Sequence, residues 1–426
     1  MEQEGFKRFE LHYGVILMLR TRRFLSAMDS MGRSRISKPV SWVLLYLMPV
    51  SAAVAFFIFI SVFRGLISSR GPQIAQNIVS LGPLVNLGIP GLNPYIPILY
   101  GWIALVIGMV VHEGAHGVIA RSLGIPVKNS GLILLFFVIP IGAFVDIEES
   151  AIKQAPKRHS ARVLAAGAGT NMVLAVLCLL LLVGIVSTMS PVASGAGITG
   201  VGQGTPAYDS GVHPGDIVTA VNGKPITNLD MVLGPNTSLT AGESINFTIY
   251  RDGQVMEINN IKLVCCQQII DTSTNQTLAS YPYIGVNSVS EGSLRSAVSG
   301  YTDIFGNPIL YIGCIPTLNI GNCQQAVPFS NSDSVFYTSP LGGALVPIAN
   351  VLYWLFFLNF NLAIFNSLPI FPLDGGQAFG VGVGALGRGR LSEAGAMRIT
   401  MAATMAVLLF LLAIIVGPYF YVYIFG

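Results

Sequence analysis

The chain has 426 residues, of which 52% are hydrophobic and only 10% are charged. A soluble globular domain carries about 25% charged residues, so this composition excludes an ordinary soluble protein and indicates an α-helical polytopic membrane protein. The net charge of +3 is small, and the positions of the basic residues are more informative than their sum.

The first 41 residues are predicted to form a cytoplasmic N-terminal arm, and they hold eight of the 23 Lys and Arg residues. Segment 14–31 alternates apolar and basic residues, as a helix lying on a membrane surface does. A solvated arm explains the same pattern equally well, and both interpretations stay open. The first apolar stretch begins near Val40 without an obvious cleavage site, so we expect no secretory signal peptide.

Apolar stretches long enough to cross a bilayer as helices occur five times along the chain. They cover residues 39–63, 95–120, 163–189, 341–368 and 399–424. A shorter apolar stretch, 129–145, is interrupted by Pro140 and Gly142. We therefore predict a re-entrant or sheet-like hairpin there, packed inside the protein. The predicted domains are the arm (1–41), a first membrane-core segment (42–189), an inserted domain (190–340) and a second membrane-core segment (341–426).

Basic residues gather on one side of the predicted spans. Of the 23 Lys and Arg residues, 17 lie in 1–41, 121–162 and 388–398, whereas six lie in 64–95 and 190–340. By the positive-inside rule, this distribution predicts a cytoplasmic N-terminus and an extracytoplasmic insert in a multi-pass cell-membrane protein.

Near the end of the second predicted span, the sequence His112-Glu113-Gly-Ala-His116 places two histidines four residues apart. On a helix, both imidazoles leave the same face, which suits two nitrogen ligands of one zinc ion, and Glu113 is placed to activate a zinc-bound water. The alternative is a polar helix turn whose histidines bond to neighbouring groups. Glu113 is the only acid between Gly71 and Ala120, and an isolated charge in an apolar span needs a partner or a function.

A catalytic zinc usually has three protein ligands, so one more is required. Asp374 is the only charged residue between Ser334 and Gly387, and it follows Pro369 and Pro372 near the predicted cytoplasmic end of the fourth span. We predict that Asp374 is the third ligand, in an unwound part of the helix. The alternative is a helix-ending turn with Asp374 as an interfacial cap.

Four segments taken together resemble the site-2 protease family of intramembrane zinc metalloproteases. These are the His112–His116 span, the Pro140-Ile-Gly142-Ala-Phe-Val hairpin, the Ala166-Gly167-Ala-Gly-Thr-Asn171 segment, and Asn366 with Leu373-Asp374-Gly375. The resemblance covers roughly residues 90–187 and 341–380.

The resemblance implies one zinc ion per chain, with His112, His116 and Asp374 as ligands and Glu113 as the general base. It implies that Asn366 and the hairpin residues Gly142, Ala143 and Phe144 bind substrate, with an unwound substrate segment pairing as an added strand. Asn171 is a further candidate contact, although a polar residue packed between helices explains it equally well. The expected activity is cleavage of transmembrane segments of single-span proteins, as in regulated intramembrane proteolysis.

The inserted domain, 190–340, holds four basic and ten acidic residues. Its Gly215-Asp216 and Asn222-Gly223 turns, within a Gly-rich pattern, resemble a PDZ domain. By this resemblance, Tyr283, Ile284, Gly285 and Val286 form the loop that holds a peptide carboxylate. The domain is expected either to capture a peptide by strand addition, to exclude bulky substrates, or to act as a structural cap without a ligand. A Cys314–Cys323 disulfide is plausible in an oxidising compartment.

Two other classes of protein remain as alternatives to the hydrolase. A membrane transporter also uses broken helices and intramembrane acids, but it usually shows matched halves, which are not visible here. A proteolytically inactive PDZ receptor would be expected to lose Glu113 or a ligand, and all of them are present. The expected partners are transmembrane substrates, the lipid bilayer and a peptide ligand of the inserted domain, and we see no nucleic-acid signature.

Overall fold

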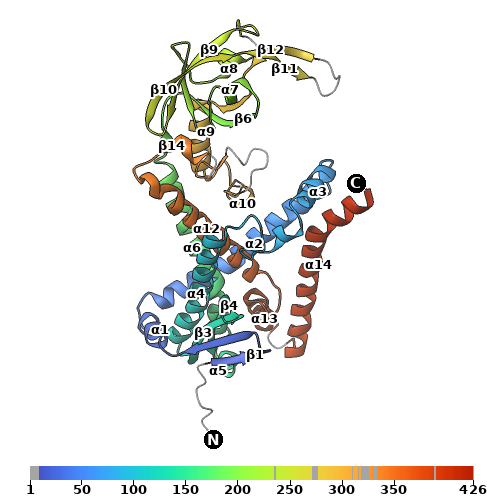
Figure 1. The fold of residues 1–426 in the computed structure, drawn as a ribbon. Coiled ribbons are helices and arrows are strands. Elements are labelled where there is room, and N and C mark those ends of the chain that lie inside the picture. Colours follow the sequence, from blue (N-terminus) through green and yellow to red (C-terminus); the bar gives the residue numbers. More distant parts are fainter. Residues whose placement is uncertain are drawn as a thin grey trace. The chain divides into compact units, whose positions relative to one another are not determined.

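The computed structural model describes residues 9–234, 237–270, 277–308, 310–314, 316–317, 326–330, 333–387 and 390–425. The chain forms two compact units. The helical unit comprises Met1–Leu179 and Val351–Gly426, and the sheet unit comprises Leu180–Asn350. Figure 1 shows the elements of both.

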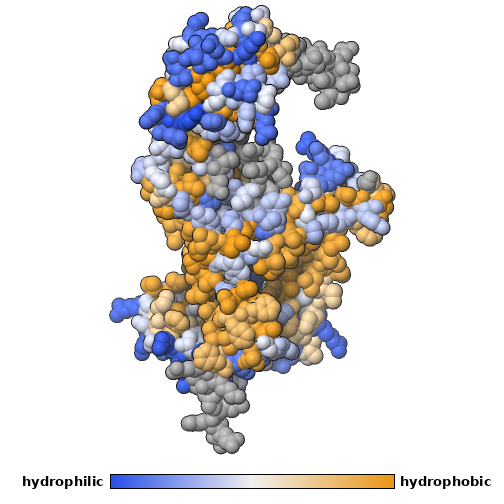
Figure 2. Space-filling model, in the orientation of Figure 1, coloured by the Kyte–Doolittle hydropathy of each residue, from blue (hydrophilic) through white to orange (hydrophobic). Residues whose placement is uncertain are grey.

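Within the described residues, five helices are long and apolar enough to cross a membrane, and they lie where the five spans are predicted. They are α2 (Ser37–Leu66), α4 (Ile98–Ser122), α6 (Lys157–Val186), α12 (Leu345–Ser367) and α14 (Glu393–Phe425). Figure 2 shows hydrophobic residues across the visible face of the helical unit, as expected of a surface that faces lipid. Shorter helices of this unit are α1 (Leu25–Gly32), α3 (Gly71–Ser80), η1 (Pro83–Asn86), α5 (Glu149–Gln154) and α13 (Asp374–Leu386).

The helix expected over residues 14–31 is found only toward its C-terminal end, as α1. The preceding residues form a hairpin of β1 (Phe9–His12) and β2 (Ile16–Thr21). Tyr13 and Gly14 make the turn with φ values of 52° and 72°, a left-handed conformation that ends a helix and suits a hairpin. Apolar and polar residues alternate with the two-residue period of a strand in β1, whereas β2 begins with four apolar residues in succession.

The predicted hairpin at 129–145 is present as β3 (Val127–Leu135) and β4 (Ile139–Ile147). The N-terminal hairpin extends it into a four-stranded antiparallel sheet of order β1-β2-β3-β4. In this sheet β4 is an edge strand, and it packs against α4. The hairpin thus brings a strand edge to the helix that carries His112 and His116.

The sheet unit contains a six-stranded sheet of order β10-β9-β7-β6-β13, with β8 paired to β7. Asn222-Gly223 makes the turn between β7 and β8, with both residues in the left-handed region as the sequence predicts. The strands are β5 (Ser190–Pro191), β6 (Ala196–Val201), β7 (Ile217–Val221), β8 (Lys224–Pro225), β9 (Ser244–Arg251), β10 (Gln254–Lys262), β11 (Val264–Ile270), β12 (Thr277–Tyr283), β13 (Val286–Val289) and β14 (Tyr337–Thr338). The helices are α7 (Pro206–Asp209), α8 (Asp230–Leu233), α9 (Glu291–Thr302), α10 (Leu310–Gly313), η2 (Ser334–Phe336) and η3 (Gly342–Ala344).

An ion pair between a buried carboxylate and a partly exposed guanidinium joins a turn of the sheet unit to β9. The Asp216 carboxylate is almost fully buried, and Arg251 donates to both of its oxygens, at 2.6 and 2.7 Å. Removing one partner of such a pair would leave the other charge uncompensated, so the pair fixes the turn on the sheet. The hydrogen bond from Arg251 to Asp216 also raises the pKa of the guanidinium.

Two cysteines of this unit, Cys265 and Cys314, are disulfide-bonded. Cys323, the predicted partner of Cys314, lies outside the described residues. The predicted Cys314–Cys323 bond therefore stays a prediction.

Candidate metal centre

The two histidines of α4 point to one acidic side chain. His112 and His116 are one turn apart on the helix, and both are buried. The Nε2 atom of each imidazole lies 3.1 Å from Oδ2 of Asp374. Residues 258 positions apart in sequence thus meet at one point, as expected if both histidines and the aspartate bind the same ion.

Asp374 reaches this point because the chain is broken after α12. Helix α12 ends at Ser367, and α13 begins with Asp374. Between them, Thr404 of α14 accepts a hydrogen bond from the Phe371 N–H at 3.0 Å, and its one O–H is shared between Thr400 O at 2.9 Å and Pro369 O at 3.2 Å. This side chain satisfies backbone groups that the broken helix leaves open, as unwound backbone at membrane depth requires.

The arrangement fits a zinc ion. The His112, His116 and Asp374 ligand atoms all lie within 4.8 Å of one another. Zinc bonds of about 2.0–2.1 Å in a tetrahedron place ligand atoms about 3.3 Å apart, close to the 3.1 Å found between each histidine and Asp374.

Gly167 of α6 leaves room beside the ligand atoms. A Cβ at this position would lie 2.5 Å from His112 Nε2 and closer still to His116 Nε2. The absence of a side chain thus keeps open the space in front of both nitrogens. The sequence places Gly167 in a family-like segment but predicts no role for it, since helix–helix distance is not visible in sequence.

The Nδ1 atom of each imidazole, which is not the one near Asp374, also has a neighbour on α6. His116 Nδ1 lies 2.7 Å from Val163 O, and His112 Nδ1 lies 3.2 Å from the Asn171 amide. Partners of this kind fix the orientation of metal-binding imidazoles.

Glu113 lies next to the ligands and contacts the edge strand. The Val145 N–H of β4 donates a hydrogen bond to Glu113 Oε2 at 3.1 Å. Val145 pairs with Ser130 of β3, but its N–H points to Glu113. The edge of β4 that is not paired with β3 therefore faces Glu113, the predicted general base.

The predicted substrate-binding residues lie on two elements. Gly142, Ala143 and Phe144 are in β4, and Asn366 is half-buried near the end of α12. The guanidinium of Arg20 lies 5.9 Å from the centre of the Phe144 ring, so the N-terminal hairpin places a positive charge near this ring. A Cβ at Gly142 would make ordinary contact with Ile133 of β3, so space alone does not require a glycine there.

The predicted peptide loop of the sheet unit closes on the segment that follows β6. Gly202 N–H donates to Gly285 O at 2.9 Å, and Ala207 N–H donates to Ile284 O at 3.0 Å. Gly285 has φ of 85°, and a Cβ there would clash with Thr205. Only glycine fits this position.

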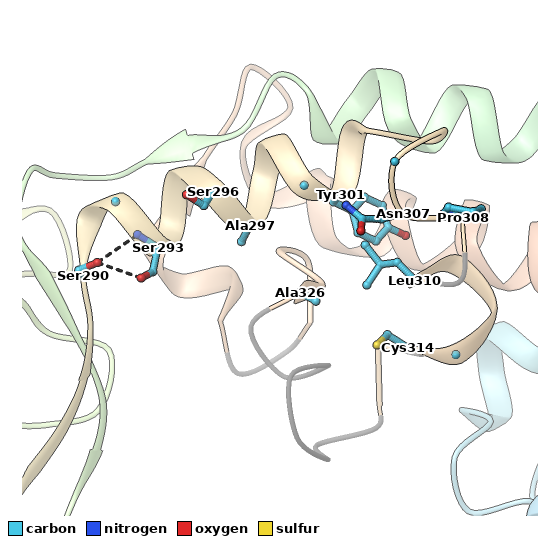
Figure 3. A pocket seen from close by; sticks show the side chains of 14 residues that line it. Ser290, Ser293, Ser296, Ala297, Tyr301, Asn307, Pro308, Leu310, Cys314 and Ala326 are labelled. Carbon is cyan, nitrogen blue, oxygen red and sulfur yellow. Dashed lines mark hydrogen bonds between the residues drawn. The ribbon is translucent and has the colours of Figure 1, made fainter. Parts of the chain in front are cut away.

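A cavity of about 960 Å³ lies elsewhere in the sheet unit, between α9 and the segments 306–308 and 310–314 (Figure 3). Among its described lining residues there is no Asp, Glu, His, Lys or Arg. Its Ser290 and Ser293 side chains bond to each other at the N-terminus of α9. The Ser290 hydroxyl caps the helix by accepting the Ser293 N–H, and Ser293 bonds to it in turn, so both hydroxyls have a structural explanation.

Comparisons with known proteins identify the family of the chain. Residues 100–412 match Peptidase family M50. The chain is 26% identical over 365 residues to the protein MJ0971 of Methanocaldococcus jannaschii, covering 85% of this chain and 76% of that protein. It is 25% identical over 346 residues to zinc metalloprotease Rip1 of Mycobacterium tuberculosis, covering 65% and 82% of the two chains. The resemblance seen in the sequence is confirmed, and the chain is a membrane protein that belongs to Peptidase family M50, a family of zinc metalloproteases.

Proposed function

We propose that this protein is an intramembrane zinc endopeptidase, with one zinc ion per chain, that cleaves transmembrane segments of single-span membrane proteins. The observation that carries the proposal is the meeting of His112, His116 and Asp374 beside Glu113, within helices apolar enough to span a membrane. A soluble substrate would not require a site built into such helices.

In this proposal His112, His116 and Asp374 hold the zinc ion. When bound, zinc polarises the scissile carbonyl and lowers the pKa of a water molecule. Glu113 takes a proton from the attacking water and returns it to the amide nitrogen of the leaving peptide. The Val145 N–H fixes Glu113 Oε2, which orients the carboxylate for this proton transfer.

The substrate must be unwound before it can react, because a helix holds its carbonyls in internal hydrogen bonds. The edge of β4 can supply replacement bonds. Val145 N–H points away from β3, and Ala143, two residues earlier in the same strand, shares that direction. An unwound substrate segment can therefore add as a fifth strand next to Ala143 and bring its peptide bond to Glu113. Asn366 is proposed as a further substrate contact.

The proposed orientation places the N-terminus and the active site toward the cytoplasm and the sheet unit outside. This orientation is supported by the unequal numbers of Lys and Arg residues in the loops on the two sides of the predicted spans. The sheet unit is proposed to be a PDZ-like domain whose Tyr283–Val286 segment binds a peptide end. The left-handed Gly285 supports a tight loop there, although a cap without a ligand would need the same fold.

The test is the Glu113→Gln variant, compared with the unsubstituted chain, in liposomes that contain a single-span substrate. General acid–base catalysis contributes about 10²–10⁴-fold, so we expect cleavage to fall by at least about 10²-fold while zinc content stays the same. Gel analysis of fragments and metal analysis of the same sample measure both. Unchanged cleavage would contradict the role of Glu113. If the unsubstituted chain cleaves no single-span substrate, a transporter or a peptide receptor becomes the better explanation.

A further inference from the structure

Asn171 of α6 is completely buried in the helical unit. Its amide nitrogen lies 3.2 Å from His112 Nδ1, and its amide oxygen has no hydrogen-bond partner among the described residues. A buried polar atom without a partner is costly, so this side chain requires an explanation.

The protonation of the His112 ring supplies an explanation for the buried Asn171 amide. Nε2 is the nitrogen that faces Asp374, so its lone pair is the one available to zinc. A neutral imidazole that offers Nε2 to a metal carries its proton on Nδ1, and that N–H needs an acceptor. His116 shows the same requirement, because its Nδ1 lies 2.7 Å from the carbonyl oxygen of Val163.

The Asn171 amide can meet this need. Rotation of the amide by 180° exchanges its oxygen and nitrogen within the same space. Oδ1 then accepts the Nδ1–H of His112 and gains a partner, while the amide nitrogen takes the position that the oxygen held. We infer that Asn171 is a positioning residue, which holds the His112 ring and selects the tautomer whose Nε2 binds zinc. This inference rests on the zinc centre of the proposed function, and it replaces a direct contact between Asn171 and substrate.

Two substitutions separate this role from others. Asn171→Asp keeps an acceptor beside Nδ1 and cannot donate, whereas Asn171→Leu keeps the size and removes both functions. Asn359→Leu is the matched control. Asn359 is also completely buried, and its Oδ1 likewise has no partner within the described stretches of the chain. Its oxygen faces Gly108, however, and not a histidine.

The experiment measures zinc affinity of the purified full-length variants by competition with a fluorescent chelator. Loss of a partner that orients a metal ligand typically costs about 10- to 100-fold in affinity. We expect a loss of this size in Asn171→Leu. In Asn171→Asp the zinc affinity should stay within about threefold of that of the unsubstituted chain, or exceed it. Asn359→Leu should also stay within about threefold.

The inference is overturned if Asn171→Leu binds zinc as tightly as Asn359→Leu, or if Asn171→Asp loses as much affinity as Asn171→Leu. In the latter case the amide nitrogen, rather than the oxygen, would be needed beside His112. Failure of the proposed function looks different, because the unsubstituted chain itself would then bind no zinc or cleave no substrate.

Discussion

Gly167 lies on α6 beside the Nε2 atoms of both histidines. In Gly167→Ala, the added methyl group would occupy the space in front of Nε2 of His112 and His116. We expect zinc affinity to fall at least about 10-fold, as when ligand orientation is disturbed, with cleavage falling in parallel. Chelator competition and fragment analysis of the same preparation measure the two effects.

Gly184 of the same helix provides the control, because a Cβ there would meet nothing within 4 Å. Gly184→Ala should therefore leave zinc affinity unchanged. If Gly167→Ala also retained normal affinity, α6 would have to move away from the histidines at little cost, and the close packing would not matter for the metal.

At the scale of residues, the sequence predicts which side chains bind the metal better than it predicts which groups pack around them. The four-residue spacing of His112 and His116 puts both on one helix face, and the isolation of Asp374 in apolar sequence marks it as a partner. The roles of Gly167 and of the Val145 N–H depend on how closely α6 and β4 approach α4. That approach is a property of packing, and a single sequence does not contain its distances.

At the scale of elements, the N-terminal hairpin shows where prediction from sequence failed. Apolar and basic residues alternate in 14–31, and this pattern favoured a surface helix or a solvated arm. The strand β2 instead pairs with β3, from Ile16 with Leu135 to Thr21 with Ser130. The partner strand lies more than a hundred residues away in sequence, and pairing with it outweighs local propensity.

The free edge of β4 leads to a prediction about substrate. Ala143→Pro removes the N–H that we place on the edge facing away from β3, so the pairing of β4 with β3 is retained. We expect cleavage to fall about 10-fold, since one backbone hydrogen bond to an added strand contributes about 1 kcal/mol or somewhat more. Zinc content should not change. Fragment analysis and metal analysis measure these effects.

Ala143→Val is the control, because it keeps the N–H and favours a strand. The idea of an added strand fails if Ala143→Pro cleaves at the rate of Ala143→Val. A fall in zinc content with Ala143→Pro would show instead that the substitution disturbs the whole sheet.

At the scale of the whole molecule, composition and span length predicted the membrane helices, because apolar runs of this length have few other stable environments. The inserted domain was harder to predict. Its turn at Asn222-Gly223 is present, but the order of its strands depends on long-range pairing. The orientation of the protein follows from charge, which is a statistical rule about loops and therefore needs an experiment.

Cysteine labelling provides that experiment. Ser34 lies between α1 and α2, Ser238 lies in the sheet unit, and both are exposed. With a membrane-impermeant maleimide, we expect Ser238→Cys to react in intact cells and Ser34→Cys to react only after permeabilisation. The unsubstituted chain measures the background from its five native cysteines, of which Cys178 is buried and Cys265 and Cys314 are disulfide-bonded. Labelling of Ser34→Cys in intact cells would invert the proposed orientation. The zinc centre would then lie toward the outer face, and its substrates would be attacked from that side.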